Sequence, residues 1–283
     1  MPIERRFDVA GLELAAQEWG APDGVPVLAV HGWLDNSGSF DLLAPLLEGC
    51  RVIAVDLAGQ GQSDFRSPDS SYLLWQDVAD LLEIADRLEW RELTLLGHSR
   101  GAAVATLFAA AFPERVSKLV LLEGGVPLAS PAEEAPGQLA RALRERRSLL
   151  GKSGRVFPDR DTAIRERAEG FSRVSREAAA ILARRSLREV PGGFQWHADQ
   201  RLKARSEMRY TPEVAAAFVA AVQAPVLMLL AEHSPFADLP AFRSLAARFR
   251  KLESHRLPGG HHFHLEGAEH ELARRIRAFL GLR

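Results

Sequence analysis

Residues 93–112 read LTLLGHSRGAAVATLFAAAF, and the interpretation of the whole chain depends on this stretch. A short apolar run ends at Gly97, a serine follows two residues later, and an Ala-rich segment begins after Gly101. This order predicts a strand, a sharp turn and a helix, with Ser99 raised at the tip of the turn as in a nucleophile elbow. Both glycines are expected because side chains there would strike neighbouring backbone. Ser99 is therefore the candidate nucleophile, and the alternative is an incidental serine in an ordinary turn.

Composition bounds the class of protein. The chain has 283 residues, a formal net charge of -1 and a single cysteine, Cys50, so it can form no internal disulfide and no cysteine-based metal cluster. The near-neutral charge gives no electrostatic case for nucleic acid or an anionic membrane as a partner. The first residues lack the apolar core of a signal peptide, and no later apolar run reaches spanning length without a charge or proline. We expect a soluble cytoplasmic protein.

Outward from the elbow, strands and helices are predicted to alternate. A hairpin turning at Gly11 comes first, and an amphipathic helix at 72–88 and a final helix after the last strand are also expected. The predicted strands of the main sheet are 25–30, 51–55, 93–96, 118–122, 225–231 and 252–257, with a further helix at 39–47. This alternation predicts an α/β fold, with a mostly parallel central sheet, helices on both faces and functional groups at the carboxyl ends of the strands.

The alternation stops at residues 126–210, which are arginine-rich and broken by Pro and Gly. We expect an inserted helical cap there, with the core made of residues 1–125 and 211–283. Glutamates interleave with the arginines, so they predict a solvated helix face rather than a binding patch. In the segment 193–197, GFQWH, bulky aromatics on a loop could line a pocket between cap and core, which makes Trp196 a candidate substrate contact.

The sequence HGW directly follows strand 25–30. A turn at this place can aim the backbone N–H of Trp33 at the oxyanion of a tetrahedral intermediate, and the N–H of Arg100 would be the second donor. His31 itself is expected to be a buried histidine bonded to backbone.

The loop DLAGQGQSD at 56–64 is rich in glycine but does not predict a nucleotide site. It lacks the Gly-Lys-Ser/Thr ending of a P-loop, and its glycines do not fit the dinucleotide fingerprint. Asp56 and Asp64 are expected to fix the turn by accepting backbone N–H bonds. No cofactor is therefore predicted.

A histidine-rich run, PGGHHFH, follows the last predicted strand. His261 comes directly after two glycines, where a loop can lay its imidazole over the sheet edge within reach of Ser99. His262 and His264 form a cluster with it, but adjacent and i,i+2 spacing on a loop is poor for a closed metal site, and no acidic-His helix motif accompanies it. We therefore predict no metal and take His261 as the candidate general base.

The elbow GHSRG, the HGW turn, the DLAGQGQSD loop and the terminal GGHHFH run resemble the α/β-hydrolase family over nearly the whole chain, in particular its capped serine hydrolase-like members. The resemblance implies the α/β-hydrolase fold. Its layout is shared with haloalkane dehalogenases and epoxide hydrolases, whose elbow carries a carboxylate. Ser99 points instead to acyl chemistry, because a serine that opened a halide or epoxide would form a stable ether.

The resemblance also implies an acid after strand 225–231, but the aspartate position of that pattern holds Ser234. Some relatives carry the acid after the strand that follows the nucleophile helix, and this chain has Glu123 there. A glutamate that ends an apolar strand is costly if it is buried unpaired, so the candidate histidine or an arginine should accompany it. Glu232 and Asp238 are the alternative acids.

These residues predict a carboxylic ester hydrolase for small to medium acyl substrates. Ser99 would attack the carbonyl, His261 would transfer its proton and Glu123 would orient the imidazole, with a small molecule as the only partner. Hydrolysis of a carbon–carbon bond in a diketone uses the same triad and is an alternative. A catalytically silent ligand-binding homologue is another, motivated by Ser234. The oligomeric state stays unknown at this level.

Overall fold

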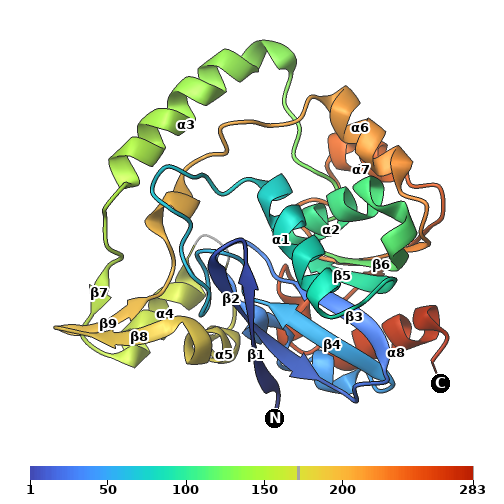
Figure 1. Ribbon diagram of the computed structural model, residues 1–283, viewed down its shortest axis with the longest axis horizontal. Coiled ribbons are helices and arrows are strands. Elements are labelled where there is room, and N and C mark those ends of the chain that lie inside the picture. Colours follow the sequence, from blue (N-terminus) through green and yellow to red (C-terminus); the bar gives the residue numbers. More distant parts are fainter. Residues whose placement is uncertain (171–172, 283) are drawn as a thin grey trace.

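The structure is a computed structural model that describes residues 1–170 and 173–282. An eight-stranded sheet lies at its centre, in the order β1-β2-β4-β3-β5-β6-β10-β11 (Figure 1). β1 (Ile3–Val9) and β2 (Leu12–Trp19) form an antiparallel hairpin, β2 pairs antiparallel with β4, and the other neighbours pair in parallel. The predicted hairpin and the mostly parallel sheet are confirmed.

The strands of the main sheet follow the predicted apolar runs. They are β3 (Val25–Val30), β4 (Cys50–Val55), β5 (Leu93–His98), β6 (Val116–Leu122), β10 (Val226–Ala231) and β11 (Leu252–Leu257). Within β3, Leu28 and Val30 pack into the core on one face of the sheet, whereas Val27 and Ala29 pack on the other. Both faces are covered, and this explains why the strand is apolar at every position instead of alternating.

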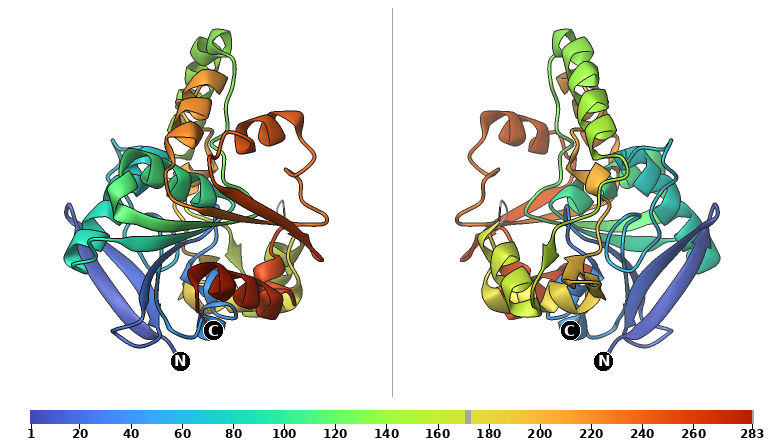
Figure 2. Two further views of the ribbon diagram at one scale, coloured as in Figure 1. Left: turned by 90° about the vertical axis from the view of Figure 1, so that its right-hand side faces the viewer. Right: turned by 90° about the vertical axis from the view of Figure 1, so that its left-hand side faces the viewer.

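Helices cover both faces of the sheet (Figure 2). One face carries α1 (Leu74–Arg87), α2 (Arg100–Ala111), α6 (Pro212–Ala221) and α7 (Pro240–Ala246), and the other carries α8 (Glu269–Leu280) and the 3₁₀ turns η1 (Ser37–Phe40) and η2 (Ala44–Leu46). The prediction of one helix at 39–47 was wrong. Pro45 lacks the N–H that a continuous helix would need and disfavours helical backbone in the preceding residue.

Residues 126–210 join β6 to β10 and build a separate layer. They contain η4 (Ala132–Glu134), α3 (Ala135–Leu149), α4 (Arg160–Glu169), α5 (Arg176–Ser186), η5 (Gln200–Lys203) and a small sheet in the order β7 (Val156–Phe157), β9 (Gly193–Trp196), β8 (Leu187–Val190). In Figure 1, α3 runs along the upper left edge, and in Figure 2 it stands well away from the main sheet. The segment therefore contains strands as well as the expected helices.

The segment 193–197 was predicted to be a loop, but most of it is strand β9. Gly193 to Trp196 pairs antiparallel with β8 across a tight turn at Gly192. Gly192 and Gly193 have φ values of 90° and 140°, which residues with side chains rarely adopt. From the sequence alone these glycines indicated a loop. In the structure they close the hairpin between β8 and β9.

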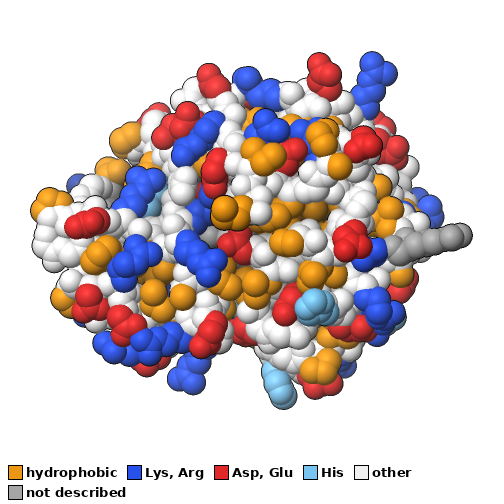
Figure 3. All heavy atoms as spheres, turned by 90° about the horizontal axis from the view of Figure 1, so that it is seen from below, with side chains coloured by type: hydrophobic (Ala, Val, Ile, Leu, Met, Phe, Trp, Pro, Cys, Tyr) orange, Lys and Arg blue, Asp and Glu red, His pale blue; other side chains and the backbone are white. Residues whose placement is uncertain are grey.

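The surface of the molecule carries charges of both signs. Figure 3 shows basic and acidic side chains interspersed over the face seen from below, with apolar side chains between them. In the part of the chain that the structure describes, no helix combines the length and the apolar character needed to cross a bilayer.

Candidate active site

Ser99 lies at the sharp turn between β5 and α2, with backbone φ and ψ of 51° and -114°. Residues other than glycine rarely adopt this backbone conformation. It makes the chain turn sharply at Ser99, so that this residue continues neither β5 nor α2. A Cβ atom on Gly97 would lie 2.5 Å from Ala102 Cα, and one on Gly101 would lie 2.1 Å from the carbonyl oxygen of Val30. Both glycines are therefore required by close backbone approach, as predicted.

Ser99, His261 and Glu123 meet above the carboxyl ends of the strands. Nε2 of His261 lies 2.9 Å from Ser99 Oγ, and its Nδ1 lies 3.2 Å from Glu123 Oε2. The Glu123 side chain is fully buried, whereas that of His261 keeps 20% of its exposure. A carboxylate only accepts hydrogen bonds, so Nδ1 carries the proton and Nε2 is left to accept one from the serine. The structure thus brings together the three residues that the sequence singled out.

Glu123 directly follows β6 and has a left-handed backbone, with φ of 49°. Its second carboxylate oxygen, Oε1, accepts a hydrogen bond of 2.6 Å from the N–H of Ala231, at the end of β10. The next residue, Gly124, has no room for a side chain, because its Cβ would lie 2.7 Å from the carbonyl oxygen of Ser99. The strained turn therefore directs a buried carboxylate toward the histidine and holds it there.

The alternative acids lie in other surroundings. Ser234, at the usual aspartate position, accepts 3.2 Å hydrogen bonds from the N–H groups of Phe236 and Ala237 and so stabilises a turn. Asp238 is exposed and pairs with two surface arginines, and Glu232 is exposed as well. The side chain of Arg100, the arginine next to Ser99, pairs with Asp77 at 2.6 Å.

One candidate oxyanion donor, the N–H of Arg100, lies in the elbow, and the other, the N–H of Trp33, lies in the turn that follows β3. Arg100 is the first residue of α2, where an N–H has no acceptor within the helix. A Cβ on Gly101 would lie 2.1 Å and 2.6 Å from the carbonyl oxygens of Val30 and His31, so the turn after β3 packs against this helix end. The N–H groups of Arg100 and Trp33 therefore belong to adjoining turns.

The family described as the alpha/beta hydrolase fold matches residues 25–268. The chain belongs to the α/β-hydrolase family. A serine hydrolase-like protein of Danio rerio is 30% identical over 277 residues, which cover 94% of this chain and 85% of that protein. The crystal structure of a hypothetical protein of Pseudomonas aeruginosa PAO1 is 44% identical, with a TM-score of 0.94 and coverage of 98% of this chain and 99% of the other. A thioesterase domain from the curacin biosynthetic pathway is 27% identical, with a TM-score of 0.86 and coverage of 98% and 99%.

In this α/β-hydrolase, His31 and the two aspartates of the 56–64 loop have the structural roles predicted for them. His31 is fully buried and accepts the N–H of Leu57 on Nε2 at 3.0 Å, and burial lowers its pKa. The aspartates accept backbone N–H bonds, Asp56 from Ser37 and Gln62 and Asp64 from Glu13. The sequence did not indicate that Asp56 also pairs with Arg185 of α5, at 2.9 Å.

Trp196 ends β9 and lies half-buried among apolar side chains of the inserted segment, including Leu182 and Leu187. The next residue, His197, stacks on Phe65 and lies 2.8 Å from the carbonyl oxygen of Gly61. The end of β9 is therefore seated on the 56–64 loop, and a contact between Trp196 and substrate stays a prediction.

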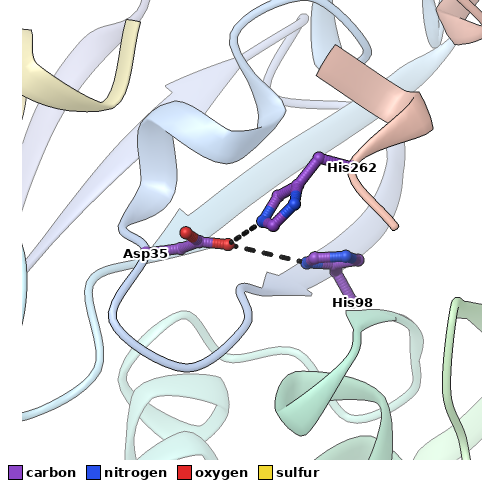
Figure 4. A group of neighbouring side chains, drawn as sticks. All are labelled: Asp35, His98 and His262. Atoms are coloured by element: carbon purple, nitrogen blue, oxygen red, sulfur yellow. Dashed lines mark hydrogen bonds and ion pairs between the residues drawn. The ribbon is translucent and has the colours of Figure 1, made fainter. Parts of the chain in front are cut away.

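Beside the Ser–His–Glu group, this member of the α/β-hydrolase family contains a second cluster that the sequence did not reveal. Asp35 Oδ2 lies 3.1 Å from His262 Nε2 and 3.7 Å from His98 Nδ1 (Figure 4). All three residues are buried, and one ligand atom from each lies within 4.8 Å of the others, so these residues could hold a metal ion. The sequence grouped His262 with His261 and His264, whereas Asp35 lies in the turn after β3 and His98 is the last residue of β5.

Burial and charge set the protonation states in this cluster. Burial holds the pKa of His98 well below its usual range and lowers that of His264 to about 3, so both rings are neutral. Burial opposes ionisation of Asp35, but attraction and hydrogen bonding to His262 and the charge of Arg167 outweigh it and hold the pKa of Asp35 well below its usual range. A buried carboxylate anion therefore lies beside the neutral imidazole of His98.

Proposed function

We propose that this protein is a serine hydrolase that cleaves carboxylic esters of small to medium acyl groups through an acyl-enzyme. The observation that carries the proposal is the hydrogen-bonded series from Ser99 Oγ through His261 to the Glu123 carboxylate. A nucleophile, a base and a group that orients the base are the parts that acyl transfer needs. The elbow carries a hydroxyl rather than a carboxylate, which favours attack on a carbonyl.

In this mechanism, Ser99 Oγ attacks the substrate carbonyl carbon while Nε2 of His261 takes the serine proton. The buried Glu123 carboxylate holds the Nδ1–H tautomer and stabilises the imidazolium. The tetrahedral oxyanion accepts hydrogen bonds from the N–H groups of Trp33 and Arg100, each worth on the order of 3 kcal/mol in comparable sites. His261 then protonates the leaving alcohol, and water attacks the acyl-enzyme by the same steps in reverse.

We propose that residues 126–210 act as a cap over this site. The segment is seated on the turn that follows β3: the indole N–H of Trp33 donates to the carbonyl oxygen of Leu202 at 2.8 Å, and the amide of Asn36 donates to that of Leu182 at 2.9 Å. This turn also supplies one of the proposed oxyanion donors, so the cap contacts an element that forms part of the proposed reaction centre. Substrate selection would then depend on cap residues such as Trp196.

One structural relative bears on which class of compound this protein hydrolyses. A structural relative is a thioesterase domain, and thioesters, like esters, react at an acyl carbonyl. A diketone hydrolase would use the same three residues, so only its products separate it from an esterase.

Cys50 is buried and free, which fits the reducing cytoplasm that we propose as the location.

The test combines turnover of p-nitrophenyl esters of increasing acyl length with labelling by a fluorophosphonate. Wild type is expected to hydrolyse the shorter esters and to gain one phosphonyl group on Ser99, located by peptide mass spectrometry. A diketone panel with product analysis runs beside it. A folded protein that neither labels nor turns over any of these compounds would contradict the proposal and favour a ligand-binding role.

A further inference from the structure

The carboxylate of Asp35 joins the inserted segment to the histidine-bearing loop. Its Oδ1 lies 2.8 Å from a guanidinium nitrogen of Arg167 in α4, and its Oδ2 lies 3.1 Å from Nε2 of His262. The Asp35 side chain is 1% exposed and that of Arg167 is 15% exposed, so water screens this connection poorly. One buried anion is thus shared by the cap and by the residue next to His261.

His98 adds a second connection in the same place. Its Nε2 lies 2.9 Å from the carbonyl oxygen of His261, and because a carbonyl only accepts, Nε2 carries the proton. The lone pair of Nδ1 then faces Asp35 Oδ2 at 3.7 Å. His98 directly precedes Ser99, so the backbone beside the nucleophile is tied to the backbone of the base.

The loop that carries His261 depends on such restraints. Two glycines precede the histidine, Gly259 has φ of 123°, and a Cβ on Gly260 would meet nothing within 4 Å. Glycine backbone is conformationally permissive, so local sterics alone do not fix the imidazole. A displacement of about 1 Å at a reacting centre can cost about 10²-fold in rate. The hydrogen bonds of His262 with Asp35 and of the His261 carbonyl oxygen with His98 therefore restrain the part of the loop that its own sequence constrains least.

We propose that Asp35 is a positioning residue that makes the orientation of His261 depend on the seating of the cap. One oxygen of the Asp35 carboxylate pairs with Arg167, and the other pairs with His262. If the contact with Arg167 is lost, Asp35 no longer restrains the loop that carries His261. The inference rests on the proposed serine hydrolase function and deepens it. It assigns to the cap a role in rate as well as in substrate selection.

Charge balance favours this role over a metal site built from the same residues. Arg167 already supplies a cation to the Asp35 carboxylate. Asp35, His98 and His262 offer three ligands, whereas structural zinc sites take four. Dialysis against a chelator is therefore expected to leave turnover unchanged. Loss of activity that returns with added Zn²⁺ would overturn the positioning role in favour of a metal site.

Substitution of Arg167 tests the cap end of the connection. Arg167→Gln is expected to lower kcat about tenfold with KM within about twofold, because the base is misplaced while substrate binding persists. Arg167→Lys, which restores the charge, should recover at least about half of the wild-type kcat. The matched control is Arg201→Gln, since Arg201 is a buried arginine of the inserted segment that pairs with Asp199 rather than with Asp35. It should lower the melting temperature and keep kcat.

Substitution of the shared carboxylate tests the coupling itself. Asp35→Asn should lower kcat at least as much as Arg167→Gln, and the double variant should be no slower than Asp35→Asn, because both changes act through one group. If Asp35→Asn fails to fold, His262→Gln replaces it in the same cycle. Additive losses in kcat, or an Arg167→Gln variant that changes only the melting temperature, would overturn the inference.

Fluorophosphonate labelling rates separate this inference from the proposed function. Wild type that does not label would contradict the serine hydrolase proposal and this inference together. Wild type that labels, with Arg167→Gln labelling at the same rate, would contradict only the positioning role. The expected result is rapid labelling of wild type and of Arg201→Gln, and labelling about tenfold slower for Arg167→Gln.

Discussion

His261 and His262 are neighbours in the chain, and each directs one ring nitrogen at a carboxylate, but only His261 faces the candidate nucleophile. The imidazole–carboxylate distances are alike, 3.2 Å to Glu123 and 3.1 Å to Asp35. The second nitrogen of His261 meets Ser99 Oγ, whereas the second nitrogen of His262 is a buried atom with no hydrogen-bond partner among the described residues. His261 is also 20% exposed against 2% for His262. A carboxylate–imidazole pair therefore becomes a candidate base only where its free nitrogen meets a hydroxyl within reach of substrate.

The largest expected effect concerns the hydroxyl that distinguishes the two pairs. Ser99→Ala should lower ester turnover by at least about 10⁴-fold and abolish fluorophosphonate labelling, because no other group can form the acyl-enzyme. Circular dichroism should remain that of wild type, since Ser99 lies at a turn outside the core. Near-full activity of the Ser99→Ala variant would contradict the assignment of Ser99 as the nucleophile.

The next effect compares the two histidines directly. His261→Ala should lower kcat/KM by about 10³-fold or more, because the serine loses its base, whereas His262→Ala should cost about tenfold through misplacement of the loop. Both rates are measured on one p-nitrophenyl ester at matched protein stability. The reverse ranking would move the base by one residue.

A smaller effect concerns the contrast between His261, the partly exposed candidate base, and the buried ring of His264. The pKa of His264 falls to about 3 from 6.5 because of its burial, so below about pH 6.5 the unfolded chain binds a proton that the folded protein excludes. Stability is therefore complete above this pH and is lost as the pH falls, by about 2 kcal/mol between about pH 6.5 and about pH 5.

Urea unfolding at about pH 7 and about pH 5 measures this loss. His264→Gln is the matched variant, because its amide can keep a contact with Ser39 Oγ, which lies 2.8 Å from Nε2 of His264, but cannot take up a proton. The variant should lose less stability on acidification than wild type. An equal loss in the two proteins would assign acid sensitivity to other groups.

Local patterns predicted the parts of the site that backbone sterics control. The glycines around Ser99, the apolar run before Glu123 and the two glycines before His261 each indicate where a strand ends and a side chain is presented. The order of parallel strands then brings these ends together. This is why Ser99 and His261 could be assigned to one site, whereas the choice of Glu123 as the acid came from the resemblance to relatives that carry the acid after the strand that follows the nucleophile helix.

The Asp35 cluster and the small sheet could not be predicted in the same way. Asp35 follows HGWL in a turn that looks like any polar loop, and its partners His98, Arg167 and His262 lie far along the chain. Their grouping depends on how the inserted segment packs on the core, which no local periodicity encodes. Strands of two to four residues, such as β7 and β8, are likewise too short to leave a periodic signal.

The central claim is that a serine, a histidine and a relocated glutamate form one catalytic unit. It is tested most directly by ester turnover of wild type, Glu123→Gln and Glu232→Gln, with fluorophosphonate labelling of each. We predict that Glu123→Gln lowers kcat by about 10³-fold or more, because the imidazole loses its orienting carboxylate, and that Glu232→Gln stays at the wild-type rate. An active Glu123→Gln variant beside an inactive Glu232→Gln variant would contradict the account.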